Sequence, residues 1–333
     1  MLIFLLAGIG AVALFLLSLF CGAVDIPAAT VLEILGGGDA ANASLRFIVI
    51  ESRLPQAVTA LLAGASLSVC GLMMQAVFRN PLADPSILGI SSGAGLGVAL
   101  VMLFLGGGIA VGSLTLGGFV AVVLAAFVGA FCVALLMFAV SEMVRSNAML
   151  LIVGVVVGYL SSSAIMLLNY FASADGIRSY MLWGMGNFSS VSSDRLPLYS
   201  AVSLLCIAAS ALLVKPLNIL VLGQQYAENL GVNTHRLRNC ILLLAGLLTA
   251  LTTAFCGPIA FVGLAVPHMS RMLLRSDDFR LLLPATLLIG GAVALLCNVA
   301  STLPASGEVL PVNALTPVVG APVVLYIMLR RRF

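Results

Sequence analysis

Long uncharged runs are the feature that most restricts how this chain can fold. No Asp, Glu, Lys or Arg occurs from Met1 to Val24, from Leu54 to Phe78 or from Pro85 to Ser141. A helix that crosses the hydrocarbon core of a bilayer needs roughly 20 apolar residues. Charged residues make up only 8% of the chain, whereas about 25% is usual in a soluble domain. The sequence therefore predicts an all-α integral membrane protein.

The charge-free intervals predict ten transmembrane helices in one polytopic domain, residues 1–333. Nine intervals have a suitable length: 1–24, 54–78, two within 85–141, 147–170, 196–214, 239–256, 281–299 and 312–329. The interval 257–274 is different, because Pro258 and Pro267 leave only eight residues between them. We expect it to cross as a short or broken helix; nine spans with a re-entrant segment is the alternative.

The distribution of basic residues predicts the orientation. With ten crossings, eleven Lys and Arg residues, including the three C-terminal arginines, lie on one side, and four lie opposite: Arg46, Arg53, Arg178 and Arg195. Cytoplasmic loops of membrane proteins are enriched in Lys and Arg. Both termini are therefore expected in the cytoplasm.

A short internal similarity suggests an inverted repeat of five plus five helices. Leu61–Gly64 followed by Cys70-Gly71 in the second span resembles Leu243–Gly246 followed by Cys256-Gly257 in the seventh. An odd number of spans between two copies inverts the second copy, as in many transporters. Coincidence in a chain rich in Leu, Ala and Gly is the alternative.

Several kinds of chemistry have no motif in the sequence. Lys215, the only lysine, is followed by Pro216 and belongs to no phosphate-binding loop. His235 and His268 lie in different segments, and the seven cysteines form no Cys-x-x-Cys pair, so no metal site is expected. The 15 basic residues are spread along the chain, which argues against nucleic-acid binding.

One motif is typical of an enzyme, but helix packing explains it better. Gly89-Ile90-Ser91-Ser92-Gly93 matches the G-x-S-x-G turn of serine hydrolases. That turn follows a strand, whereas this segment opens a glycine-rich span, where small residues let helices approach closely. No charge lies near the middle of a predicted span, which disfavours an ion-driven transporter. We expect the chain not to be an enzyme and its energy source to lie in another subunit.

Three segments together resemble a known family. The first contains Arg53-Leu54-Pro55 and Gly71 through Pro85, the second runs from Gly257 to Arg271, and the third contains Glu308–Pro311, Thr316 and Gly320–Pro322. They are similar to the FecCD family, the permeases of binding-protein-dependent ABC importers for iron–siderophore complexes, haem and vitamin B12. The residues that carry the resemblance most specifically are Asn80, Pro81, Leu82, Ala83, Pro85, Gly257, Phe261, Gly263, Pro267, His268 and Arg271.

The resemblance implies one subunit of a larger assembly in the bacterial inner membrane. A second copy of this chain, or a related permease, would complete the pathway. Two cytoplasmic ATPase subunits would bind ATP and Mg, so that this chain itself needs no cofactor, and a periplasmic binding protein would deliver the cargo. An iron chelate, either a ferric siderophore or haem, is the first expectation. Cobalamin is the alternative, and an ion-driven secondary transporter is disfavoured.

The resemblance also implies two sites on the cytoplasmic side. The loop between the sixth and seventh spans is expected to form short helices that rest on the ATPase, through Leu222, Gly223, Ala227, Leu230 and Gly231. A cytoplasmic gate is expected at Asn80, Leu82, Asn147 and Ala148.

A third implied site is Arg53, at the outer end of the second span. In the family, arginines at the outer face pair with glutamates of the binding protein, and Arg53 matches one such position. Gln56 stands where the family usually has a second arginine, and Arg46 or Arg195 could replace it. A helix-end cation among lipid headgroups is the other interpretation of Arg53.

Overall fold

The structure, a computed structural model, describes residues 2–37, 43–105, 108–111, 114–144, 146–302 and 309–330. The described chain is helical apart from one hairpin. In that hairpin β1 (Gly108–Val111) pairs antiparallel with β2 (Leu114–Gly117), with Gly108 opposite Gly117. Glu308, Arg145, Arg331 and Arg332, which the sequence analysis used, lie outside the described residues.

Ten helices overlap the ten predicted spans. They are α1 (Leu2–Phe20), α4 (Leu54–Phe78), α5 (Ile90–Ala99, continued by the π-helical η3, Leu100–Phe104), α6 (Gly118–Met143), α7 (Asn147–Phe171), α9 (Leu196–Leu212), α12 (Thr234–Cys256), α13 (Val262–Leu274), α14 (Phe279–Ser301) and α15 (Val312–Arg330). By length and composition six spans in the described chain qualify as membrane-crossing, or seven if the bent pair α9–α10 counts as one. The count of ten spans therefore stays a prediction.

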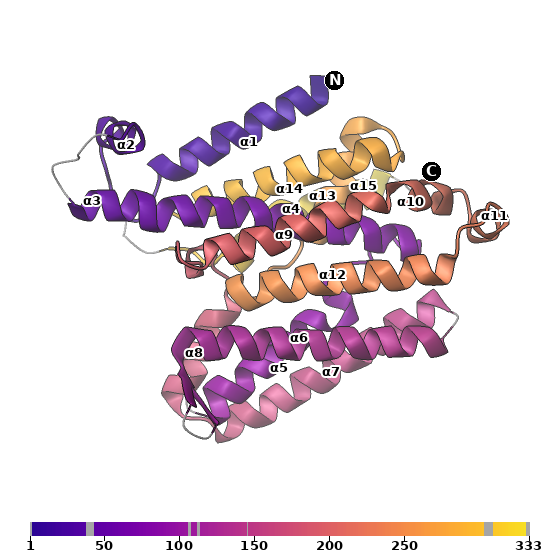
Figure 1. The fold of residues 1–333 in the computed structure, drawn as a ribbon, viewed down its shortest axis with the longest axis horizontal. Coiled ribbons are helices and arrows are strands. Elements are labelled where there is room, and N and C mark those ends of the chain that lie inside the picture. Colours follow the sequence, from indigo (N-terminus) through magenta and orange to yellow (C-terminus); the bar gives the residue numbers. More distant parts are fainter. Residues whose placement is uncertain are drawn as a thin grey trace.

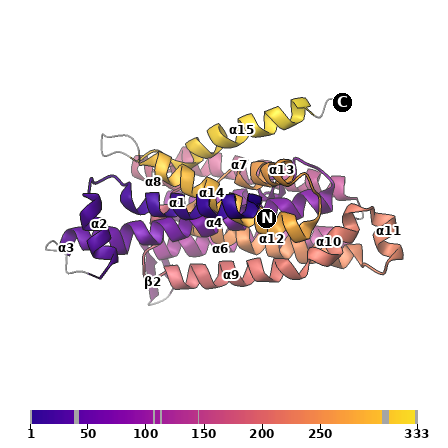
Figure 2. The same ribbon diagram turned by 90° about the horizontal axis from the view of Figure 1, so that it is seen from above.

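Short helices gather at the two ends of the bundle (Figure 1). One end carries the hairpin and three short helices, α2 (Ala28–Leu35), α3 (Ala43–Phe47, continued by η1, Ile48–Arg53) and α8 (Ala174–Gly184). The other carries α10 (Val214–Val221) and α11 (Gln224–Asn229), and α1 begins and α15 ends toward it (Figure 2). We call them the α8 end and the α11 end; the predicted topology makes the α11 end cytoplasmic. The short η2 (Pro85–Leu88) and η4 (Phe188–Ser190) complete the helices.

Helix α4 is the centre of the bundle, and small residues bring its neighbours close. A Cβ added at Gly64 would lie 2.2 Å from the carbonyl oxygen of Gly290 in α14. One added at Gly71 would lie 1.7 Å from the carbonyl oxygen of Gly263 in α13. Helix α12 lies beside α4 and runs antiparallel to it (Figure 1), with the Cys70 thiol 3.7 Å from the carbonyl of Ala245. The two similar segments thus occupy adjacent, oppositely directed helices, as an inverted repeat would.

The G-x-S-x-G segment is a packing surface, as predicted. A Cβ at Gly93 would lie 2.6 Å from the carbonyl oxygen of Gly129 in α6, and one at Gly97 would lie 2.1 Å from that of Ala125. The motif opens α5 directly after the turn at Gly89, and no strand precedes it among the described residues. Its small residues therefore serve the α5–α6 contact.

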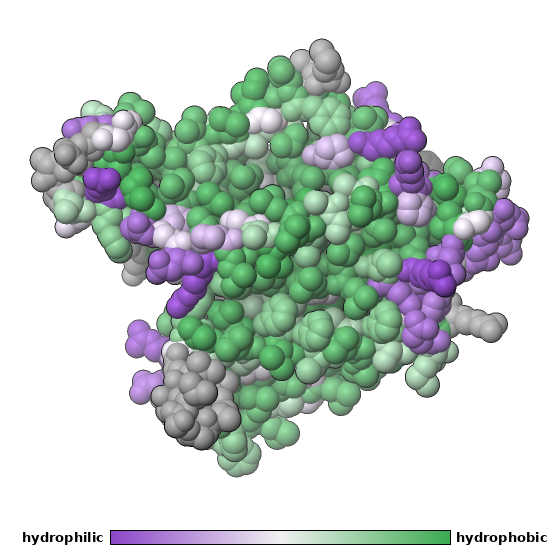
Figure 3. All heavy atoms as spheres, viewed as in Figure 1, coloured by the Kyte–Doolittle hydropathy of each residue, from purple (hydrophilic) through white to green (hydrophobic). Residues whose placement is uncertain are grey.

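Apolar side chains cover the face between the two ends, where hydrophilic residues gather (Figure 3). Helix α7 shows this most clearly, because Tyr159, Met166, Tyr170 and Phe171 are all at least 70% exposed. So much exposed apolar surface needs lipid or another protein to cover it. The structure therefore agrees with a membrane protein.

Candidate functional site

The loop predicted to meet the ATPase forms two short helices, α10 and α11, at the α11 end. Gly223 and Gly231 flank α11 with φ of +132° and +83°, values that favour glycine. The small Ala227 is fully buried, and its amide donates to the carbonyl of Gly223 at 2.9 Å. Its size therefore serves packing within this chain.

Three large apolar or aromatic side chains are exposed on the same loop, beside the exposed polar residues Gln225, Glu228 and Asn229. Leu222 is 66% exposed, Tyr226 53% and Leu230 54%. We call these three residues the α11 surface. Large apolar side chains exposed on a loop beyond the bundle end are typical of a contact with another protein.

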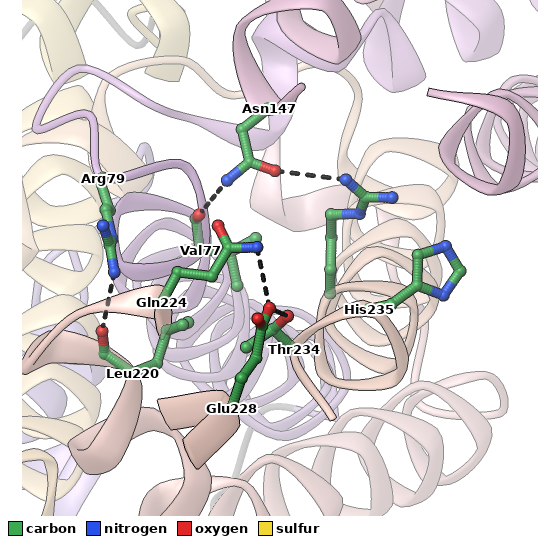
Figure 4. Close-up of a pocket in the computed structure, with 9 residues that line it drawn as sticks. Val77, Arg79, Asn147, Leu220, Gln224, Glu228, Thr234 and His235 are labelled. Atoms are coloured by element: carbon green, nitrogen blue, oxygen red, sulfur yellow. Dashed lines mark hydrogen bonds between the residues drawn. The ribbon is translucent and has the colours of Figure 1, made fainter. Parts of the chain in front are cut away.

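A pocket of about 250 Å³ lies between α11 and the bundle (Figure 4). Glu228 of α11 lines it and accepts hydrogen bonds from the Thr234 hydroxyl at 2.7 Å and from the Gln224 side chain at 3.1 Å. These bonds favour the ionised form and lower the pKa of Glu228. The residues that line the pocket are Val77, Arg79, Asn147, Leu220, Gln224, Glu228, Thr234, His235 and Arg238.

Arg238 of α12 is 6% exposed and holds the end of α6. Its Nη2 donates to the backbone carbonyls of Ser141 and, at 3.1 Å, of Val144. The last carbonyls of a helix have no partner within the helix and carry partial negative charge, so a cation stabilises them. Its Nη1 donates to the Asn147 side-chain oxygen at 3.4 Å.

The structure brings the two predicted gate segments close together. The Asn147 side chain donates to the carbonyl of Val77 at 2.7 Å, three residues before Asn80. Asn80 forms a tight turn in which its side-chain oxygen accepts from the amide of Leu82 at 3.0 Å. Leu82 and Ala148 are exposed. The segments thus join at the end of α4.

The two strongest family motifs pack against each other. His268 Nε2 lies 2.7 Å from the carbonyl oxygen of Pro81, which can only accept, so His268 donates. A Cβ at Gly263 would lie 2.9 Å from the Asp84 carboxylate and 3.5 Å from the ring of Pro85. Ala83 and Pro85 are buried beside this contact.

Pro267 explains why Gly263 lies against a glycine of α4. Proline has no amide hydrogen, so the carbonyl four residues earlier, that of Gly263, loses its helical partner. That carbonyl points at the Cα of Gly71. Before this helix the chain turns through Gly257 and Phe261, with φ of +75° and +69°.

A series of side-chain hydrogen bonds connects α4 and α13 nearer the α11 end. Gln75 of α4 donates to the carbonyl of Leu264 at 3.2 Å and accepts from Arg271 at 2.5 Å. Arg271 also lies 3.5 Å from Asp277. Arg271 therefore joins α13 to α4.

Arg53 is not placed as the docking prediction requires. The side chain is 4% exposed, and its Nη1 donates to the carbonyls of Leu19 at 2.9 Å and Phe20 at 2.8 Å. Its Nη2 donates to the carbonyl of Val24. A guanidinium used in this way inside the chain is not available to a partner protein, which argues against both the docking and the lipid-headgroup interpretation. Gln56, one turn on, donates to Asn298 of α14 at 2.8 Å.

Comparison with known proteins agrees with this geometry. The model of the FecCD transport family matches residues 10–330. This chain belongs to the FecCD transport family.

Relatives of this FecCD chain have related cargoes. The hemin transport system permease protein HmuU of Yersinia pestis is 35% identical over 294 residues, which are 87% of this chain and 86% of HmuU. The vitamin B12 import system permease protein BtuC of Photorhabdus laumondii is 35% identical over 288 residues, 86% of this chain and 83% of BtuC. A solved metal-chelate type ABC transporter in an inward-facing conformation superimposes with a TM-score of 0.84 and 29% identity, covering 98% of this chain and 99% of that one.

Two polar residues that organise this FecCD chain were not among the predicted site residues. Gln75 carries a buried polar amide within a span that has no charged residue, and such a group must find hydrogen-bond partners on another helix. Arg238 directly precedes a predicted span. Both positions were readable in the sequence, whereas their partners depend on the tertiary fold.

Proposed function

We propose that this chain is the permease subunit of an ATP-driven importer that moves an iron chelate, a ferric siderophore or haem, across the bacterial inner membrane. The observation that carries the proposal is the family match over residues 10–330, together with a haem permease among the relatives. The apolar face between the two ends and the exposed side chains of the α11 surface support a subunit that needs both lipid and a cytoplasmic partner.

The assembly that this function requires contains further subunits. A second copy of this chain or a related permease covers the exposed face of α7, and two ATPase subunits bind ATP and Mg at the α11 end. A periplasmic binding protein docks at the α8 end, and both termini lie in the cytoplasm. The predicted excess of Lys and Arg on the α11 side supports this orientation.

Cobalamin is the second candidate cargo. The BtuC relative is as similar to this chain as the haem permease, at 35% identity. Both cargoes are large chelates, so a wide and weakly binding path suits either.

Reconstitution tests the function and the cargo together. The chain, its ATPase and its binding protein are placed in proteoliposomes, and uptake of haem, a ferric siderophore and cobalamin is measured with and without Mg-ATP. We expect ATP-dependent uptake of an iron chelate. ATP-dependent uptake of cobalamin alone would select the second candidate. Uptake that persists without ATP but collapses with the proton gradient would contradict the importer.

The α11 surface is tested by binding of the ATPase. Leu222→Glu places a charge on an apolar contact and should weaken association with the ATPase by roughly tenfold. Gln225→Ala, exposed in the same loop, is the matched control and should bind normally. Equal binding by both variants would mean that the ATPase contacts another surface.

The gate is tested by cross-linking. Cysteines at Asn80, Leu82, Asn147 and Ala148 should cross-link between two copies in some nucleotide states and not in others. Cross-linking that ignores nucleotide would argue against a gate at these positions.

A further inference from the structure

Four hydrogen bonds, together with the backbone segments between them, form a ring around the pocket beside α11 (Figure 4). From α11, Glu228 reaches Thr234, the first residue of α12, and Arg238 lies one turn further along that helix. Arg238 reaches Asn147, and Asn147 reaches the carbonyl of Val77 at the end of α4. The ring thus links the loop proposed to meet the ATPase with both predicted gate segments.

The ring closes through Arg79, directly after α4. Its Nη2 donates to the carbonyl of Leu220 in α10 at 3.4 Å, and α10 leads back into α11. Arg79 has φ of +46°, a value uncommon outside glycine, and this ends α4 and turns the chain into the Asn80–Pro81 segment. Movement of α10 and α11 can therefore reach the end of α4 by two routes, one through Arg79 and the other through Arg238 and Asn147.

The links of the ring differ in length. Thr234 to Glu228 and Asn147 to Val77 are each 2.7 Å. Arg238 to Asn147 and Arg79 to Leu220 are each 3.4 Å, longer than the 2.7–3.2 Å typical of good N–H···O bonds. The ring is therefore weakest where α12 meets α7 and where α4 meets α10.

We propose that Arg238 is a positioning residue that transmits movement of α11 to the start of α7 through its contact with Asn147. Arg238 is suited to this role because its Nη2 is fixed on the carbonyls of Ser141 and Val144 while its Nη1 alone contacts Asn147. Displacement of the first turns of α12 then moves the end of α6 and the start of α7 with it. The inference rests on the proposed function, since it presumes that an ATPase moves α11.

The test uses the complete transporter in proteoliposomes, with two readouts. The first is the number of ATP molecules hydrolysed per haem imported, or per cobalamin if haem is not a cargo. The second is a spin label on Ala148→Cys, in a chain whose exposed Cys132 and Cys240 are serine. The spectrum of the label reports whether Mg-ATP changes the mobility or surroundings of the first turn of α7, and this readout does not depend on which cargo is used.

Arg238→Gln should abolish the response of the spin label to Mg-ATP and raise the ATP hydrolysed per imported molecule about tenfold, a typical coupling between sites. Arg236→Gln, an exposed arginine on the same helix, is the matched control and should behave as the wild type. Asn147→Ala, at a half-buried position, should reproduce the loss even if Arg238→Gln folds poorly. The double variant, Arg238→Gln with Asn147→Ala, should raise the ATP hydrolysed per imported molecule no further than either single variant, because both substitutions break the same hydrogen bond.

Three results would overturn the inference: an unchanged spin-label response in Arg238→Gln, a proportional fall of hydrolysis and uptake, or additive effects in the double variant. The proposed function would fail differently. In that case the wild type itself would show neither ATP-dependent uptake nor a spin-label response.

Discussion

Arg53 and Arg238 occupy comparable positions at opposite ends of the molecule. Each lies at or near the start of a central helix, Arg53 directly before α4 and Arg238 in the second turn of α12. Each is almost fully buried, at 4% and 6% exposure, and each donates to carbonyls at the end of a neighbouring helix. In both cases helix-terminal carbonyls help to stabilise the charge of the guanidinium.

The two arginines differ in what else they touch. The three hydrogen bonds that the Arg53 side chain donates all go to one segment, the end of α1 and the residues just after it. Arg238 divides its bonds between the end of α6 and the first residue of α7. Arg53 therefore fixes the end of α1, whereas Arg238 joins the end of α6 to the start of α7 through the longer bond to Asn147.

The largest expected effect is on stability at the α8 end. Arg53→Ala leaves buried carbonyls without a donor, so it should lower the free energy of unfolding by roughly 3 kcal/mol, measured by thermal unfolding in detergent. Arg46→Ala, exposed at the same end, should change it by less than about 0.5 kcal/mol. If Arg53→Glu were instead rescued by charge reversal on the binding protein, Arg53 would be a docking residue after all.

The same substitution at both positions separates the two roles. A lysine has three donors on one nitrogen and can bind converging carbonyls, but it cannot span two segments as a guanidinium does. Arg53→Lys and Arg238→Lys should therefore each cost about 1 kcal/mol of stability. Only Arg238→Lys should raise the ATP hydrolysed per imported molecule. Matching transport defects in both variants would remove the distinction.

A smaller effect is expected at Gly22, which lies against the Arg53 guanidinium. A Cβ there would lie 2.6 Å from Nε and 2.7 Å from Nη2. Gly22→Ala should displace the flexible end of Arg53 and cost about 1 kcal/mol in thermal unfolding. Gly8→Ala, with no atom within 4 Å of its added Cβ, should be neutral or slightly stabilising. A neutral Gly22→Ala would show that Arg53 can move freely.

The smallest effect is expected at Glu228. Hydrogen bonds to the carboxylate lower its pKa below the ordinary 4.5, so the ionised form persists until the pH falls through that lowered value. ATP-coupled uptake should therefore show no change from this group between pH 7.5 and about pH 5.5. Glu228→Gln should raise the ATP hydrolysed per imported molecule only roughly twofold, because the residue is exposed. A steep loss between those pH values in the wild type, absent in Glu228→Gln, would contradict this assignment.

The fold was readable from the sequence to the extent that charge and hydropathy determine it. The end of α4 at Phe78 was predicted correctly, because Arg79 bounds the uncharged interval, whereas the helix begins earlier than predicted, since α3 and η1 continue directly into α4 from Ala43. Hydropathy could not tell which helices are central. The apolar 18-residue stretches of the spans that contain α4 and α7 have similar mean hydropathies, 1.9 and 2.2, yet 89% of the first stretch and 17% of the second are buried. Burial depends on small residues such as Gly64 and Gly71 meeting a partner helix.

The candidate site was readable in part for the same reason. Resemblance located the α11 loop and the segments around Asn80 and Asn147, and the structure places these at one end. The docking role of Arg53 stays a prediction, because its position at a span end looks identical in the sequence whether the side chain points outward or donates to the end of α1. Only the location of the Leu19 and Phe20 carbonyls, which sequence does not reveal, decides between them.

The contact between Gly71 and Gly263 limits which parts of the molecule can move. Separating α13 from α4 would leave the carbonyl that Pro267 releases facing hydrocarbon, where an unpaired polar group costs several kcal/mol. The two helices, with the Pro81 turn held between them by His268, should therefore travel as one rigid body through every step of a transport cycle. Rearrangement is then left to the opposite side of the pathway mouth, so a disulfide designed between α4 and α13 should leave turnover intact.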